Sequence, residues 1–150
     1  MSKLYTMIAL AGAMSAASFT GAFAQEGDAA AGEKTFKKRC STCHIVGDVA
    51  EVSKKAGPNL TDIFGRKPGS REQFTKYGDS IVALGEKLPA WDEASLDEYI
   101  QNPRKYLRAK LEDKKAKSRM SFKLSGKKRA DDRADIISYL KSLNPPKEGS

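Results

Sequence analysis

The sequence has few side chains of the kinds that usually form metal sites, because it holds only two cysteines and one histidine. A structural zinc site needs about four such ligands, so these three residues exclude it. Long apolar runs are missing after residue 24, and no later segment is apolar enough to cross a bilayer. Sustained alternation of apolar and polar residues is missing as well, which argues against strands. The sequence therefore predicts an all-α chain.

The first 24 residues contain the three parts of a secretory signal peptide. Lys3 gives a positive start, residues 7–17 are apolar and alanine-rich, and Ala22-Phe23-Ala24 fits the small-x-small cleavage rule. The apolar run is too short for a membrane anchor. The alternative, a disordered or buried N-terminal helix, leaves the order of these three parts unexplained. We expect cleavage of residues 1–24, with residues 25–150 forming one soluble, exported domain.

The charge of the chain is strongly basic, with 27 Lys and Arg against 19 Asp and Glu and a formal net charge of +8. Loss of Lys3 with the signal would lower this charge by one. Such an excess suits a nucleic acid, an anionic membrane or an acidic protein partner. Export disfavours nucleic acid. The basic residues cluster, since residues 104–129 hold twelve of them against only Glu112 and Asp113.

Capping residues predict short helices separated by long loops. Asp28 and Asp92 each stand before a helical pattern, and Asn102 followed by Pro103 ends one helix and starts another. The predicted helices cover about 29–38, 93–101, a short stretch from 103, and about 130–143. Helices this short bury little apolar surface for the length of the chain. We therefore expect a large apolar group to fill the centre.

The segment Cys40-Ser41-Thr42-Cys43-His44 is the attachment signal of a c-type haem. Both thiols would add to the porphyrin vinyl groups, which places the adjacent His44 under the iron as its ligand. Two cysteines in an exported protein could instead form a disulfide. A thioredoxin-like dithiol would require a βαβ setting that the sequence lacks. The histidine and the export signal together favour one covalently attached haem.

The second axial ligand of the iron can be argued by elimination among the plausible donors, which are Met, His, Lys and Tyr. His44 is the only histidine, so a second histidine ligand within the chain is excluded. Three of the four methionines lie in the signal peptide, which leaves Met120. A lone methionine can also be a core residue. Met120, however, lies in a predicted loop between Arg119 and Ser121, and we interpret it as the second ligand.

Five further motifs occur in a fixed order along the chain. They are Gly57-Pro58-Asn59-Leu60, Phe64-Gly65-Arg66-Lys67, Trp91, Tyr99-Ile100-Gln101-Asn102-Pro103 and Met120-Ser121-Phe122. From Gly27 to Leu143 the chain thus resembles the class I cytochromes c. Extra residues before Gly57 and between Tyr106 and Met120 make it most similar to the longer bacterial cytochromes c2. The resemblance implies an all-α fold of short helices and long loops wrapped around one covalent haem.

The resemblance also implies a role for several side chains outside the cysteine motif. Pro58 resembles the proline whose carbonyl accepts a hydrogen bond from the ligand histidine. Tyr77 and Trp91 resemble the donors to a buried haem propionate, and Arg66 resembles the cation that offsets its charge.

Two more aromatic residues match family positions on the methionine side. Tyr99 resembles the tyrosine near the methionine sulfur, and Phe122 resembles the aromatic residue that shields one haem face. On residue type alone, Trp91 and Tyr99 could equally be ordinary core aromatics.

Together these expectations describe a monomeric periplasmic electron carrier rather than an enzyme. With both axial positions occupied, the iron would cycle between Fe(III) and Fe(II) without binding substrate. A haem enzyme or gas-binding protein would need an open sixth position. The resemblance implies a cytochrome bc complex as donor, and a photosynthetic reaction centre or a terminal oxidase as acceptor. The basic clusters would steer acidic surfaces of these membrane complexes toward the haem edge.

Overall fold

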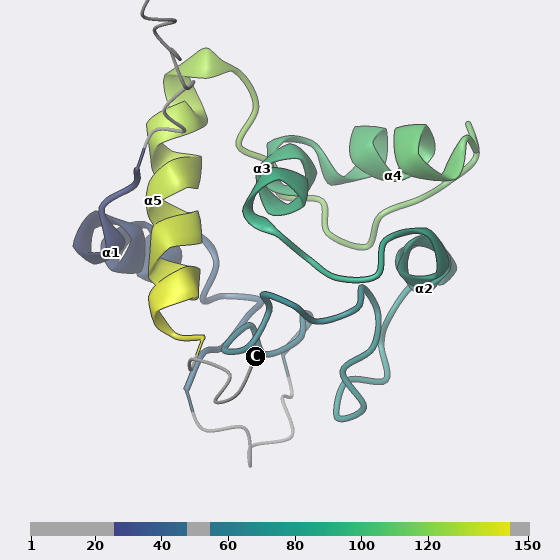
Figure 1. The fold of residues 1–150 in the computed structure, drawn as a ribbon, viewed down its shortest axis with the longest axis horizontal. Helices are drawn as coiled ribbons and strands as arrows, with labels where there is room; N and C mark the ends of the chain where they lie inside the picture. Colours follow the sequence, from purple (N-terminus) through teal and green to yellow (C-terminus); the bar gives the residue numbers. More distant parts are fainter. Residues whose placement is uncertain (1–25, 48–54, 145–150) are drawn as a thin grey trace, which may run out of the picture.

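The computed structural model describes residues 26–47 and 55–144, and this part of the chain is helical (Figure 1). Its only β-type pairings are two isolated parallel bridges, so the all-α prediction is confirmed. The predicted signal peptide lies outside the described residues. Among those described, no helix has the length and apolar character needed to cross a membrane. The helices are α1 (Ala29–Arg39), α2 (Asp79–Lys87), α3 (Glu93–Gln101), α4 (Pro103–Leu111) and α5 (Ala130–Ser142), with a 3-10 turn at Lys127–Arg129 before α5.

Helices α1 and α5 come from opposite ends of the described chain and pack against each other (Figure 1). Asp28 caps α1 by accepting from the N–H of Ala30 at 2.7 Å, and its own N–H donates to Asp135 of α5 at 2.8 Å. The backbones approach so closely at Gly32 that a Cβ there would lie 1.9 Å from the Asp135 carbonyl oxygen. Phe36 fills the contact beside Tyr139, with ring centroids 5.6 Å apart.

The boundaries of α3 and α4 follow the capping signals read from the sequence. Asp92 accepts from the N–H of Ser95 at 2.7 Å, and the Ser95 hydroxyl accepts from the N–H of Asp92 at 3.0 Å. Asn102 ends α3 and caps α4, where Pro103 occupies the first turn. The predictions for these helices are therefore confirmed, because each depended on local hydrogen bonds that the tertiary structure leaves intact.

Helix α2 was not predicted from the sequence. Its N-cap is Gly78, which offers no side-chain hydrogen bond, and Gly85 lies within it. Glycine is a poor helix former, so neither local signal favours a helix here. Packing decides instead: Leu84 is completely buried, and a Cβ at Gly85 would lie 2.5 Å from the Pro68 carbonyl oxygen.

The segment after α4, where the sequence analysis noted extra residues between Tyr106 and Met120, is held by specific hydrogen bonds. Glu112 ends α4 in the left-handed region at φ 56°. Ala116 is 2% exposed, and its carbonyl accepts from Arg108 Nε at 3.2 Å. The N–H of Lys117 then donates to the Ser80 hydroxyl at the start of α2, at 3.0 Å. The segment is thus tied to both α4 and α2 before it reaches Met120.

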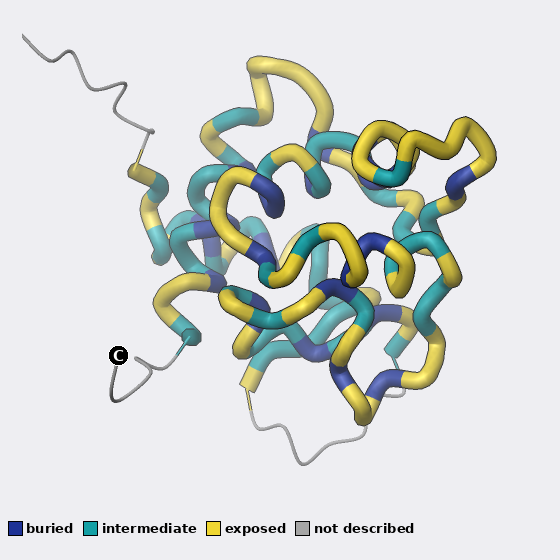
Figure 2. Tube along the Cα trace, turned by 45° about the vertical axis from the view of Figure 1, so that its right-hand side comes forward, coloured by how far each residue is buried: buried dark blue, intermediate teal, exposed yellow. Residues whose placement is uncertain are grey.

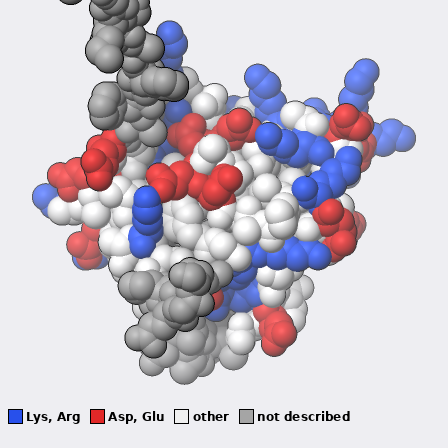
Figure 3. Space-filling model, viewed as in Figure 1, with Lys and Arg blue, Asp and Glu red and all other residues white. Residues whose placement is uncertain are grey.

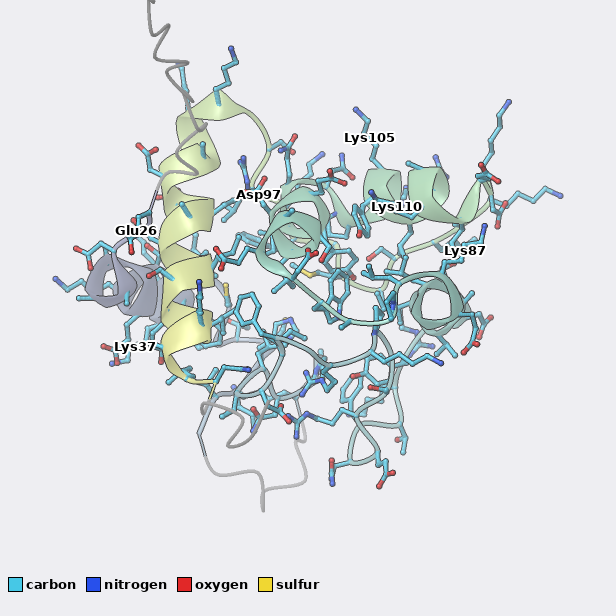
Figure 4. All side chains as sticks on the ribbon, in the orientation of Figure 1. Glu26, Lys37, Lys87, Asp97, Lys105 and Lys110 are labelled. Carbon is cyan, nitrogen blue, oxygen red and sulfur yellow. The ribbon has the colours of Figure 1, made fainter. Side chains whose placement is uncertain are left out.

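Helix α5 buries Ile136, Ile137 and Leu140 in the core, and Leu143, which follows the helix, is partly buried against it. Arg133 on the same helix is 5% exposed and donates to the Asp97 carboxylate at 2.7 Å and to the Leu124 carbonyl at 2.8 Å. Figure 4 shows Asp97 between α3 and α5. Along the chain, buried positions form short stretches between exposed ones (Figure 2).

Candidate haem-binding site

All five helices contribute a wall residue to one cavity of about 220 Å³. Each helix supplies an apolar side chain to the wall, and in the order α1 to α5 these include Phe36, Ile81, Leu96, Leu107 and Ile136. The loops that the sequence marked complete the wall. Every site residue nominated from the sequence lines this cavity, namely Cys40, Cys43, His44, Pro58, Arg66, Tyr77, Trp91, Tyr99, Met120 and Phe122. The fold therefore brings together positions as far apart in the chain as Cys40 and Phe122.

The cysteine motif directly follows α1 and continues its turn. The N–H groups of Cys43 and His44 donate to the Cys40 carbonyl at 3.0 and 2.8 Å. Both thiols are free, with Cys43 exposed and Cys40 partly buried. Burial raises the pKa of the Cys40 thiol to about 11. A redox dithiol needs a lowered thiol pKa, and burial acts on Cys40 in the opposite direction. The two cysteines are not joined in a disulfide.

The His44 ring has one nitrogen engaged by the backbone. Its Nδ1 lies 2.9 Å from the Pro58 carbonyl oxygen, which can only accept, so Nδ1 donates and Nε2 keeps its lone pair. Burial lowers the His44 pKa, which favours the neutral ring that a metal ion needs. Gly57 makes room for the ring and donates its N–H to the Cys43 carbonyl at 2.8 Å. The sequence analysis assigned a role to Pro58 but none to Gly57, and the structure shows that Gly57 leaves space for the imidazole.

The Met120 loop is held by a residue that the sequence analysis missed. The Ser118 hydroxyl accepts from the Met120 N–H at 3.1 Å and donates to the Met120 carbonyl at 2.9 Å. Next to it, Arg119 Nη1 donates to the Lys76 carbonyl at 3.1 Å, which joins this loop to the chain before α2. Burial raises the pKa of Tyr99, and a hydrogen bond with Ser118 partly opposes that rise.

The backbone of Trp91 anchors the loop that carries Arg66. Its N–H donates to the Arg66 carbonyl and its carbonyl accepts from the Gly65 N–H, both at 2.9 Å. Its ring is 5% exposed and lies 5.2 Å from the Tyr99 ring and 6.2 Å from the Tyr106 ring, centroid to centroid. Trp91 and Tyr99 are thus core aromatics and cavity residues at once, so the two interpretations of the sequence are compatible.

Arg66 belongs to a charged cluster that the family motifs did not indicate. Its Nη2 donates to the Asn59 carbonyl at 3.1 Å, and its Nη1 pairs with the Asp62 carboxylate. Arg71 pairs with the same carboxylate. Burial raises the pKa of Tyr77, and the charges of Arg66 and Arg71 oppose that rise. The spacing of Asp62 four residues before Arg66 could have suggested their ion pair. No such local spacing suggests the pairing of Arg71 with Asp62.

The charged residues that line the cavity are all basic within the described part of the chain. They are Arg39, Arg66, Lys67, Lys76, Lys117 and Arg119. Figure 3 shows Lys and Arg gathered over α4 and the loop after it, while Asp and Glu are frequent over α1, α3 and α5. In Figure 4, Lys105 extends outward from α4. Positive and negative charges are therefore unevenly distributed over the face shown in Figure 3.

The donor set fits a haem better than a bare metal ion. In the described residues, no group of three or more His, Cys, Asp and Glu side chains could hold a metal ion. The cavity combines apolar walls with two free thiols, one neutral imidazole and one thioether. A metal already held by a porphyrin needs only two axial donors, and the porphyrin needs apolar walls and attachment points. The residues present supply each of these.

Comparison with known proteins agrees with this assignment. The family model for cytochrome c matches residues 29–144. The cytochrome c2 of Rhodobacter capsulatus is 46% identical over 140 residues, covering 91% of this chain and 97% of that protein. The cytochrome c-550 of Paracoccus versutus is 46% identical over 130 residues, covering 83% and 80% of the two chains.

Solved structures show the same fold. The cytochrome c2 of Rhodobacter sphaeroides superposes with a TM-score of 0.68 at 40% identity, over 78% of this chain and 96% of that one. The cytochrome c2 of Rhodospirillum centenum gives a TM-score of 0.69 at 34% identity, over 79% and 100%. With a cavity built from the cysteine motif and the family positions, and with relatives matched over nearly their full length, the chain belongs to the cytochrome c family, whose members carry one covalent haem c and transfer electrons.

Proposed function

We propose that the protein is a soluble periplasmic one-electron carrier with a six-coordinate haem iron. Cys40 and Cys43 attach the haem, and His44 and Met120 are the axial ligands. The observation that carries this proposal is that His44, oriented through Pro58, and Met120 line the same cavity. When bound, the haem supplies an iron that alternates between Fe(III) and Fe(II). A soft thioether donor favours Fe(II), so this ligation gives a raised reduction potential.

The other cavity residues then have positioning roles. Pro58 fixes the orientation of the His44 imidazole and increases its basicity through their hydrogen bond. Tyr77 and Trp91 donate to a haem propionate, and Arg66 offsets the propionate charge.

On the methionine side, Tyr99 lies near the Met120 sulfur and Phe122 shields one face of the haem. Phe122 is half-buried and packs against the apolar core, which suits this role. With His44 and Met120 both serving as ligands, the site would transfer electrons without binding a substrate.

The partners follow from the basic rim of the cavity. Its cations would attract acidic surfaces of membrane redox complexes and speed the encounter more than they prolong it. We infer a cytochrome bc complex as the donor and a reaction centre or terminal oxidase as the acceptor, each bound transiently by a monomer. Residues 1–24 act as the cleaved signal and residues 25–150 as the working domain.

Absorption spectroscopy tests the ligation. The ferric protein is expected to show the weak near-infrared band of methionine-to-iron charge transfer, and Met120→Ala is expected to lose it. Ser121→Ala is the matched control, because Ser121 is the exposed neighbour of Met120, and this variant is expected to keep the band. A high-spin, five-coordinate wild-type spectrum would contradict the proposal.

Kinetics with membranes test the charge argument. The oxidation rate of the reduced protein is expected to fall steeply as salt is added, because salt screens steering charges. Lys117→Glu at the rim is expected to slow the reaction at low salt. Lys141→Glu is the control, because Lys141 lies on α5 outside the cavity lining. Equal effects of both variants, or a flat salt dependence, would refute the steering role.

A further inference from the structure

Two buried guanidinium groups share one carboxylate beside the haem cavity. Arg66 and Arg71 both pair with Asp62, and their side chains are only 13% and 7% exposed. The Asp62 side chain is 50% exposed, so its carboxylate also reaches solvent. Two positive charges against one negative charge leave the cluster with a net positive charge inside a weakly screened environment.

The cluster is coupled to the cavity through two residues that line it. Arg66 is one, and Tyr77 is the other. The charges of both arginines act on the Tyr77 hydroxyl, and the Arg71 backbone also makes a hydrogen bond with it. The field of Arg71 therefore extends to the cavity, and Asp62 is linked to the cavity through its pairing with Arg66, although neither Arg71 nor Asp62 lines it.

We propose that Asp62 and Arg71 adjust the reduction potential of the haem as a charge pair of opposite sign. This rests on the proposed carrier function and on the position of Arg66 at the haem. The ferric haem carries one more positive charge than the ferrous haem. A nearby anion therefore stabilises Fe(III) and lowers the potential, while a nearby cation raises it.

The pairing also preserves the role of Arg66. Asp62 alone would neutralise Arg66 and reduce the charge that it offers to a propionate. Arg71 supplies a second partner for the carboxylate, so Arg66 keeps part of its field for the cavity. Arg71 and Asp62 are positioning residues, because they act on the haem through Arg66 and Tyr77.

A double-mutant cycle measured by redox titration tests the proposal. Asp62→Asn is expected to raise the potential and Arg71→Gln to lower it, while the double variant returns close to the wild-type value. Glu93→Gln is the matched control, because Glu93 pairs with Lys141 and neither residue lines the cavity. Added salt is expected to abolish the small control shift but to leave most of the Arg71→Gln shift, since buried charges are screened less.

A purely structural role predicts a different pattern. Both single variants would then shift the potential in the same direction, and this outcome would overturn the proposal. So would single shifts no larger than that of Glu93→Gln. The charge-preserving variants Asp62→Glu and Arg71→Lys are expected to stay near the wild-type potential, and shifts as large as those of the neutral variants would also overturn it.

Two features of the design keep the test decisive. If Arg71→Gln does not fold, Asp62→Asn and the double variant still decide, because the single variant must have the higher potential. The near-infrared methionine band is recorded in every variant. Absence of the band from the wild type would contradict the His44/Met120 site. A band that is present, together with variant potentials equal to that of the wild type, would contradict only the role of Asp62 and Arg71.

Discussion

A Cβ built on Gly57 would lie 2.4 Å from Cε1 of His44, so the imidazole occupies its place only because residue 57 has no side chain. The same ring is also held by a hydrogen bond from its Nδ1 to the Pro58 carbonyl oxygen, at 2.9 Å. The consecutive residues Gly57 and Pro58 thus set the orientation of the proposed iron ligand.

Gly57→Ala is expected to displace the His44 ring and to break its hydrogen bond to Pro58, because overpacking moves side chains off their preferred positions. The haem-to-protein ratio and the Soret spectrum of purified protein measure the effect, and both are expected to change. Gly78→Ala is the control, since a Cβ there would meet only the flexible Arg119 side chain at 3.3 Å. Full haem content with an unchanged spectrum in Gly57→Ala would contradict this account of the pair.

Ser118→Ala is expected to loosen the Met120 loop, because its hydroxyl both accepts from and donates to the Met120 backbone. A hydrogen bond contributes about 1 kcal/mol, so imidazole added to the ferric protein is expected to bind roughly fivefold more tightly. Ser118→Thr keeps the hydroxyl and is expected to behave as wild type. Ser121→Ala is the second control, and an equal change there would show that Ser118 has no special role.

Gly32→Ala is expected to destabilise the fold by about 3 kcal/mol, because the new Cβ would collide with the Asp135 carbonyl of α5. This reverses the usual sign, since glycine-to-alanine changes within helices normally stabilise by about 1 kcal/mol. Ala30→Leu, on the exposed side of α1, is expected to stay within about 0.5 kcal/mol of wild type. Denaturant unfolding measures both, and a stabilised Gly32→Ala would show that the helices can separate without cost.

Tyr106 is expected to make the fold sensitive to alkaline pH. Burial, followed by the charges of Glu98 and Asp92, raises its pKa to about 12, above the ordinary value of 10.0. The unfolded chain loses this proton first, so the stabilisation is complete below pH 10 and is lost as the pH rises toward 12.

Tyr106→Phe keeps the ring and removes the titrating group. The fall in unfolding free energy between pH 10 and pH 12 is expected to be smaller in this variant, by about 2 kcal/mol at most. The pKa values of Tyr77, Tyr99 and Tyr139 are raised too, so part of the fall is expected to remain. An identical pH profile in both proteins would rule out Tyr106 as a contributor.

Local signals in the sequence were enough to predict most of the helices. Asp28, Asp92 and Asn102 cap their helices with hydrogen bonds to neighbours in the chain, and such bonds need no tertiary context. Helix α2 has no such cap and contains Gly85, so its formation depends on the burial of Leu84 by distant segments. A reading of local pattern therefore had no means of finding it.

The sequence by itself determined the candidate chemistry of the site, because the cysteine motif, the only histidine and the one methionine after residue 24 limit what can attach and face a haem. Only the tertiary structure decided what positions those groups. Gly57 makes room for the His44 ring, and Arg71 joins Asp62 beside the cavity. These contacts depend on where the backbone brings the residues together in space, which residue type and local spacing do not encode.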